Sequence, residues 1–164
     1  MCGSQSTEPE EVRHVFLKSL YQAHVLNVAA TNRWCNSPEM LPDYRAWLRA
    51  ETYLRLDILI SELQKETASI HNLQGIDAVR ILVSRHSALS IIEVRHLSFS
   101  ELIFLLQPAL ESANIPPEVI QYPPHVDEQL QDVPYNQRAG LTPCSEAEWD
   151  HSLLKKYQDL YNPQ

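Results

Sequence analysis

The tetrapeptide Glu-Val-Arg-His occurs twice in the chain, at positions 11–14 and again at positions 93–96. On a helix, a glutamate and a histidine three residues apart lie on the same face. Two such pairs facing each other, completed by carboxylates from neighbouring helices, would make an oxygen- and nitrogen-ligated site for divalent metal ions. The repeat therefore suggests a metal centre with Glu11, His14, Glu93 and His96 among its ligands.

Paired Glu-x-x-His motifs of this kind bind two iron or manganese ions in ferritin-like helical bundles. Here a Glu-x-x-His would stand on the first helix, whereas those bundles begin with a single glutamate. Glu11 and His14 also fall within the first turns of a predicted helix, where the helix dipole already favours an acidic residue. We therefore expect no metal or other cofactor, and keep the ferritin-like bundle as an alternative. Its remaining carboxylates would come from Glu51, Asp57, Glu62 and Glu101.

Glycine is scarce, with three residues in a chain of 164. Loops that cradle phosphate groups need several glycines close together, so that backbone N–H groups can approach the ligand. The chain also has no Gly-x-Ser-x-Gly motif, which carries the nucleophile of α/β-hydrolases. These features disfavour nucleotide-dependent enzymes and α/β-hydrolases, and they favour a protein without enzymatic activity.

Cysteine usage indicates a reducing compartment. The three cysteines, Cys2, Cys35 and Cys144, are odd in number, and no Cys-x-x-Cys motif occurs. A disulfide framework is therefore not expected. The chain has no apolar run of the roughly 18 residues that a membrane span requires, and its first residues do not have the pattern of a secretory signal. We expect a cytoplasmic protein that does not enter a membrane.

The balance of charge is acidic, with a formal net charge of −8 and a pI of about 5.3. A nucleic-acid binder that relies on phosphate contacts needs a basic face, so nucleic acid is not an expected partner. An acidic protein can instead mimic nucleic acid and block a basic cleft. That second alternative requires a continuous acidic stripe, and here acidic residues alternate with Arg and Lys. The leading hypothesis is a protein-binding or regulatory protein that acts through an interface with another protein or with itself.

The segment that must position these residues is 43–67, which the sequence predicts as one long helix without an internal breaker. Its apolar residues cover most of the helix circumference, and its clear polar stripe holds Glu51, Arg55 and Glu62. A surface helix shows a narrower apolar stripe, so this helix is expected to be surrounded by others. The spacing of Glu51 and Arg55 also predicts an i,i+4 ion pair.

Further helices are predicted on both sides of the central one. Thr7 opens a first helix through a capping box, and this helix should end near Asn32. The region 76–97 contains β-branched runs that allow two short strands or a helix interrupted near His86. Because no glycine-containing hairpin turn separates the runs, we favour the helix.

A second capping box at Ser98 begins another apolar helix, which should end near Ala113. Pro108 lies inside this segment and is expected to bend the helix or to end its first part. The leucine-rich face of the segment makes it a natural packing neighbour of the central helix.

Residues 115–143 are rich in proline and too long for a plain connector. We predict extended segments and turns, with one short helix at 126–130. Spaced apolar residues could attach this stretch to the helical body. Tyr122 and Tyr135 are its candidates for contacting a partner, because tyrosine is enriched at interfaces.

A third capping box, at Ser145, predicts the start of a final amphipathic helix. Its apolar stripe consists of Trp149, Leu153, Tyr157 and Leu160. A helix of this length is marginal alone, so the stripe must dock on the protein's own helices, on a second copy or on another protein. We predict the four residues of the stripe, with the two tyrosines, as the partner-binding residues.

Together these patterns predict an all-α fold with four or five helices in a bundle-like core around 43–67. The expected organisation is a single domain in three parts: a helical core at 1–114, a proline-rich arm at 115–143 and a C-terminal helix at 144–164.

Overall fold

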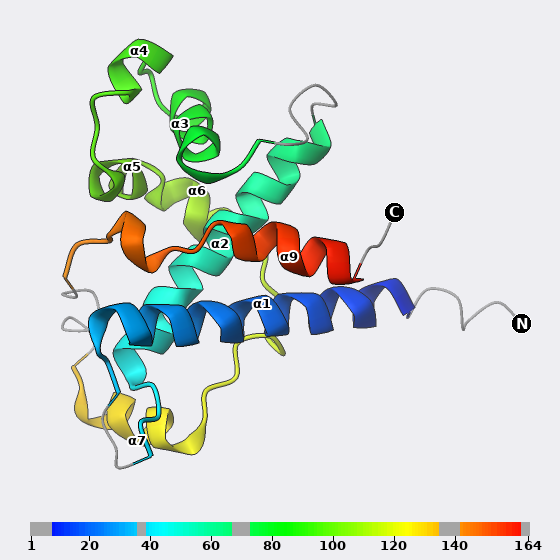
Figure 1. The fold of residues 1–164 in the computed structure, drawn as a ribbon, viewed down its shortest axis with the longest axis vertical. Coiled ribbons are helices and arrows are strands. Elements are labelled where there is room, and N and C mark those ends of the chain that lie inside the picture. The colour runs from blue at the N-terminus through cyan, green and yellow to red at the C-terminus, as the bar shows by residue number, and fades with distance from the viewer. Residues whose placement is uncertain (1–7, 36–38, 67–72, 135–141, 162–164) are drawn as a thin grey trace, which may run out of the picture.

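A computed structural model describes residues 8–35, 39–66, 73–134 and 142–161, and these residues form an all-α fold (Figure 1). The described part of the chain contains no β-strand, and one isolated antiparallel bridge joins Cys35 to Pro42. The predicted fold class is therefore confirmed. The predicted cap at Thr7 lies outside the described residues.

The central helix is α2, Tyr44–Glu66, which agrees with the predicted bounds. Twelve of its 23 residues are buried, because it packs against α1 (Glu8–Asn32) on one side and against α3 (Gly75–His86), α6 (Gln107–Ser112) and α7 (Pro124–Asp132) on others. Asp43 begins the helix: its Oδ1 accepts a hydrogen bond of 2.9 Å from the backbone N–H of Arg45. The predicted ion pair between Glu51 and Arg55 forms at 3.0 Å.

The first helix, α1 (Glu8–Asn32), crosses α2, and the two helices share the core of the molecule (Figure 1). Tyr21 lies at this crossing, where its hydroxyl donates to the backbone carbonyl of Trp47 at 2.9 Å. The rings of Tyr21 and Trp47 meet edge to face, with centroids 5.5 Å apart. The contact fixes the middle of α1 against the first half of α2.

The region 76–97 is helical, as the missing hairpin turn indicated. It contains α3, Gly75–His86, and a short α4, Ile91–Val94. Gly75 has a φ of 67°, and the ring of His151 lies 3.4 Å from the place where a Cβ would stand. Glycine is favoured here by the backbone conformation, because L side chains rarely adopt this φ, whereas the distance to the His151 ring would allow a Cβ.

The segment after Ser98 is divided by its proline. It forms α5, Phe99–Leu105, and α6, Gln107–Ser112, with Pro108 in the first turn of α6. Proline is tolerated in a first turn because no N–H is needed there. The predicted capping box at Ser98 is present, with the Glu101 side chain accepting from the backbone N–H of Ser98.

The described part of the proline-rich stretch lies against α2. It contains α7, Pro124–Asp132, which extends the short helix predicted there. The buried side chains of Val126 and Leu130 hold α7 in place. Gln129 also accepts a hydrogen bond of 2.9 Å from the backbone N–H of Tyr44, at the start of α2.

The C-terminal segment does not form the single helix that was predicted from Ser145. The capping box is present, but it closes only a 3-10 turn, η2 (Glu146–Glu148). The chain is extended at Trp149, and α9 (Ser152–Tyr161) starts after it. The break arises because Glu148 and Trp149 both turn into the protein interior, and Asp150 then begins a new helix by accepting from the Ser152 backbone at 3.1 Å.

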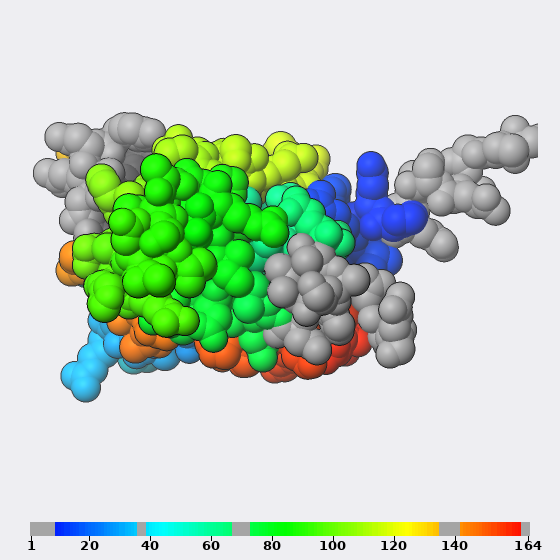
Figure 2. Space-filling view, turned by 90° about the horizontal axis from the view of Figure 1, so that it is seen from above, coloured from blue at the N-terminus to red at the C-terminus, as the bar shows by residue number. Residues whose placement is uncertain are grey.

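The arrangement leaves α9 between α1 and the second half of α2, where these two helices diverge (Figure 1). Seen from above, residues of α3 to α5 cover much of one face, with the C-terminal segment along one edge (Figure 2). No helix in the described part of the chain has both the length and the apolar character needed to cross a membrane.

Candidate functional site

The two Glu-x-x-His motifs do not meet in the structure. Glu11 and His14 lie near the start of α1, whereas Glu93 and His96 lie on and just after α4, in a different part of the molecule (Figure 1). Among the described residues, no group of three or more His, Cys, Asp or Glu side chains is placed to hold a metal ion.

Glu93 has a structural partner that explains its position. Its carboxylate accepts a hydrogen bond of 2.8 Å from the backbone N–H of Ser90, and the Ser90 hydroxyl accepts from the Glu93 backbone at 3.2 Å. This is a capping box at the start of α4. The Ser-x-x-Glu spacing was present in the sequence, and it identifies Glu93 as a helix cap.

A second polar stripe runs along α2, in addition to the stripe of Glu51, Arg55 and Glu62. Arg49, Tyr53 and Asp57 are four residues apart, so they share one face of the helix, and all three are buried. This face meets residues 142–149 and α1. We call the resulting contact the polar seam, and its remaining members are His24, Asn27 and Asn32 of α1 with Glu148 and Trp149.

Glu148 is the centre of the polar seam. Its side chain is 1% exposed and receives hydrogen bonds from Arg49 and from the Tyr53 hydroxyl. The Asn32 side chain donates to its second oxygen at 2.5 Å, and the Asn27 side chain donates to its backbone carbonyl at 2.9 Å. A buried carboxylate is tolerated only when it is paired and hydrogen-bonded in this way.

Asp57 forms the other half of the polar seam. Its Oδ2 lies 2.5 Å from Nε2 of His24, and its Oδ1 accepts from the indole N–H of Trp149 at 3.2 Å. The Trp149 ring stacks on Phe99, with centroids 5.6 Å apart. His24 is fully buried, so its ring cannot reach a substrate in this structure.

The electrostatics of the polar seam do not favour nucleophilic chemistry. Burial raises the pKa of the Cys144 thiol above its ordinary value, although the nearby Arg49 charge opposes this. Burial also raises the pKa of the Tyr53 hydroxyl, with Cys144 and Glu148 adding to the effect. Reactive cysteines have lowered pKa values, because the thiolate is the nucleophile. The hydrogen bonds of the polar seam join the C-terminal segment to α1 and α2.

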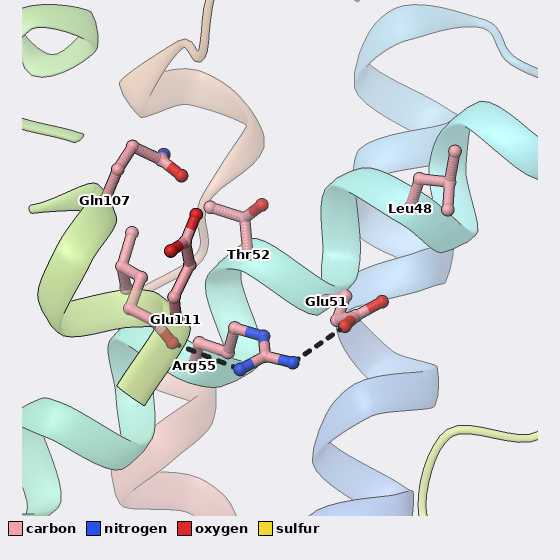
Figure 3. A pocket seen from close by; sticks show the side chains of 7 residues that line it. Leu48, Glu51, Thr52, Arg55, Gln107 and Glu111 are labelled. Carbon is pink, nitrogen blue, oxygen red and sulfur yellow. Dashed lines mark hydrogen bonds and ion pairs between the residues drawn. The ribbon is translucent and has the colours of Figure 1, made fainter. Parts of the chain in front are cut away.

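A small hollow of about 270 Å³ lies between α2 and α6 (Figure 3). Its main cation, Arg55, is already engaged: Nη1 donates to the backbone carbonyls of Leu110 and Ala113 at 3.1 and 3.2 Å, and Nη2 contacts Glu51. Arginine commonly satisfies the free carbonyls at a helix C-terminus. This hollow is accounted for by the attachment of α6 to α2.

A larger groove, of about 740 Å³, opens between α1, α2 and α9. Its apolar lining includes Phe16 and Leu17 of α1, Ile58 of α2 and Leu154 of α9. Pockets between the helices of a bundle are common ligand sites, and this volume lies within the usual range for them. We call this hollow the α1–α9 groove.

The α1–α9 groove has charged residues of both signs on two of its walls. Glu11 and Arg13 lie on α1, and Glu62 and Lys65 lie on α2. Within the described part of the chain, none of these four side chains has an ion-pair partner. Their charges remain available to a bound molecule.

The residues predicted to bind a partner lie in different surroundings. Trp149 is buried in the polar seam, and Leu153 and Tyr157 are half-buried against the core. Leu160 is 62% exposed, beside the α1–α9 groove residue Tyr161.

Of the two tyrosines in the proline-rich stretch, Tyr122 is half-buried, and its ring centroid lies 6.4 Å from that of Trp47. Tyr135 lies outside the described residues. Trp149 and Tyr122 thus already contact the protein's own core, and Leu160 is the most exposed of the predicted set that the structure describes.

The sequence does not predict the α1–α9 groove, because no motif marks the point at which two helices diverge. The chain matches no protein-family model, no curated protein and no solved structure with which it was compared. Its function must therefore be inferred from its own residues.

Proposed function

We propose that the protein acts by binding another protein, which inserts apolar side chains into the α1–α9 groove. The observation that carries this proposal is the groove itself, with its apolar lining and four charged side chains that lack ion-pair partners among the described residues. Apolar anchors surrounded by polar contacts are the usual anatomy of a protein interface.

The walls of the groove define the chemistry of the occupant. Apart from Asp57, which is paired with His24, each of α1 and α2 contributes one acidic and one basic side chain, Glu11 with Arg13 and Glu62 with Lys65. A partner segment that carries both signs of charge around an apolar face would pair with all four. An amphipathic helix has this character, and the α1–α9 groove is bounded by helices on which such a helix can pack.

Val12 allows the proposal to be tested with a matched control. Val12 lines the groove and is 45% exposed, whereas Val15, on the same helix, is 50% exposed and is not among the groove residues. The two substitutions Val12→Asp and Val15→Asp place the same charge on the same helix at similar exposure. Both variants should fold, because neither side chain is in the core.

The experiment is affinity purification of each variant from cells that naturally produce the protein, with quantitative mass spectrometry of the bound proteins. We expect Val12→Asp to weaken capture of the partner by about tenfold or more, because the new carboxylate would lose its hydration against the apolar side chains that the partner inserts. Val15→Asp should retain the partner. Equal capture by both variants would show that the α1–α9 groove is not the binding site.

A further inference from the structure

The C-terminal segment is attached to the helical body in two very different ways. Residues 145–149 are held by the polar seam, in which Glu148 and Trp149 are 1% and 3% exposed. In α9, which follows, Leu154 is the one buried residue at 3% exposure. Two of the five residues 145–149 are therefore buried, against one of the ten residues of α9.

The other contacts of α9 are made by half-buried side chains, among them Leu153 and Tyr157, which pack against the core. The hydroxyls of Tyr161 and Ser19 are 3.1 Å apart, and the Gln158 side chain donates to Gln64 at 3.3 Å. The ring of Tyr161 meets Phe16 at a centroid distance of 6.2 Å. Hydrogen bonds between part-buried side chains contribute little net stability, because water replaces them on opening.

The α9 helix is also a wall of the α1–α9 groove, to which it contributes Leu154, Gln158 and Tyr161. Opening of α9 would join the groove to the apolar surface that Leu154 covers. Segments with few buried apolar contacts are those that open locally without global unfolding. The α9 helix lies along the groove and has a single buried side chain, which are the features expected of a segment that opens locally.

We propose that α9 is a lid, which detaches from α1 and α2 as a unit while residues 145–149 stay anchored. The open state accepts an amphipathic helix of a partner in the place that α9 occupies when closed. This inference extends the proposed function, because it states what controls access to the α1–α9 groove and which kind of segment enters it. Because α9 is itself an amphipathic helix that packs on α1 and α2, the surface beneath it can accept a helix of this kind.

Lid opening can be measured on the full chain by native-state hydrogen exchange. Amides of α9 should exchange at least about a hundredfold faster than the buried amides of α2, at a rate insensitive to low denaturant. Leu154→Ala should speed exchange in α9 by a factor on the order of 30 or more and leave α2 unchanged. Leu160→Ala, the same substitution at a position that is 62% exposed, should have little effect.

Exchange of α9 only through global unfolding, with the same protection as α2, would overturn the lid. An equal effect of Leu154→Ala and Leu160→Ala would also contradict it, because the docking would then not depend on the one buried side chain.

Control of access is tested with a fluorescent peptide corresponding to residues 150–161, added to each full-length variant and followed by fluorescence anisotropy. The peptide should bind Leu154→Ala more tightly than the wild type or Leu160→Ala, because the weakened α9 vacates the site. Equal affinity for all three would overturn the control of access by α9. That result would leave the Val12→Asp comparison intact, so failure of the lid and failure of the proposed function can be told apart.

Discussion

At the scale of single residues, the polar seam depends on Glu148, which is the partner of the buried Arg49. Glu148→Gln keeps the size of the side chain but leaves the guanidinium without a charge partner. Breaking a buried pair in this way costs about 3–5 kcal/mol. We expect that loss in the free energy of unfolding, measured by denaturant titration.

The control for this prediction is Glu146→Gln, in the same 3-10 turn but exposed. Exposed substitutions of this kind usually change stability by less than about 0.5 kcal/mol. Similar stabilities for the two variants would show that Glu148 does not hold the C-terminal segment.

Cys144 gives a prediction about pH, because burial raises the pKa of its thiol. The folded state favours the neutral thiol, so its contribution to stability is complete below the ordinary thiol pKa and is lost as pH rises through the raised value. The rate of alkylation of Cys144 in the folded protein should keep rising at pH values where the urea-unfolded chain has levelled off. Identical pH midpoints in the two states would contradict this.

The polar seam shows why residue pairings were hard to predict from the sequence. Arg49 and Glu148 are 99 positions apart, and no local pattern connects them. The sequence suggests Asp57 as a carboxylate ligand of the alternative metal site, but in the structure its partner is His24. The spacing of Arg49, Tyr53 and Asp57, four residues apart, was the one sequence pattern that indicated a buried polar face. It is difficult to recognise because most of the other residues of this helix are apolar.

At the scale of elements, capping boxes and proline positions predicted most of the helices correctly, but not the start of the C-terminal helix. The capping box at Ser98 and the break at Pro108 are present as expected, because both effects act within one or two turns. The capping box at Ser145 is also present, but its helix ends after three residues. It ends there because Glu148 and Trp149 contact residues of the polar seam that are distant in the sequence.

The central position of α2 leads to a prediction for its core face. Leu56 is fully buried, so Leu56→Asp would place an unpaired charge in the packed interior. Such a charge costs several kcal/mol, a large share of the roughly 5–15 kcal/mol that stabilises a domain. We expect the cooperative thermal transition, followed by circular dichroism, to be lost or strongly lowered. The control is Glu62→Asp, at an exposed position of the same helix, which should unfold at the same temperature as the wild type. If Leu56→Asp also kept the wild-type transition temperature, the buried packing of α2 would be refuted.

At the scale of the whole molecule, the all-α class could be predicted because it follows from periodicity in each segment. The α1–α9 groove could not be predicted, because it depends on how α1 and α2 diverge and on the position of α9 between them. Crossing geometry is set by many side chains together, and no single motif encodes it.

The central claim is that a protein partner occupies the α1–α9 groove, and site-specific photo-crosslinking tests it most directly. A photoreactive amino acid is placed at position 12 or at position 15, and the protein is irradiated in cells that naturally produce it. We expect a discrete crosslinked protein from position 12, with little or none from position 15. Crosslinks of equal yield at both positions, or none at position 12, would contradict it.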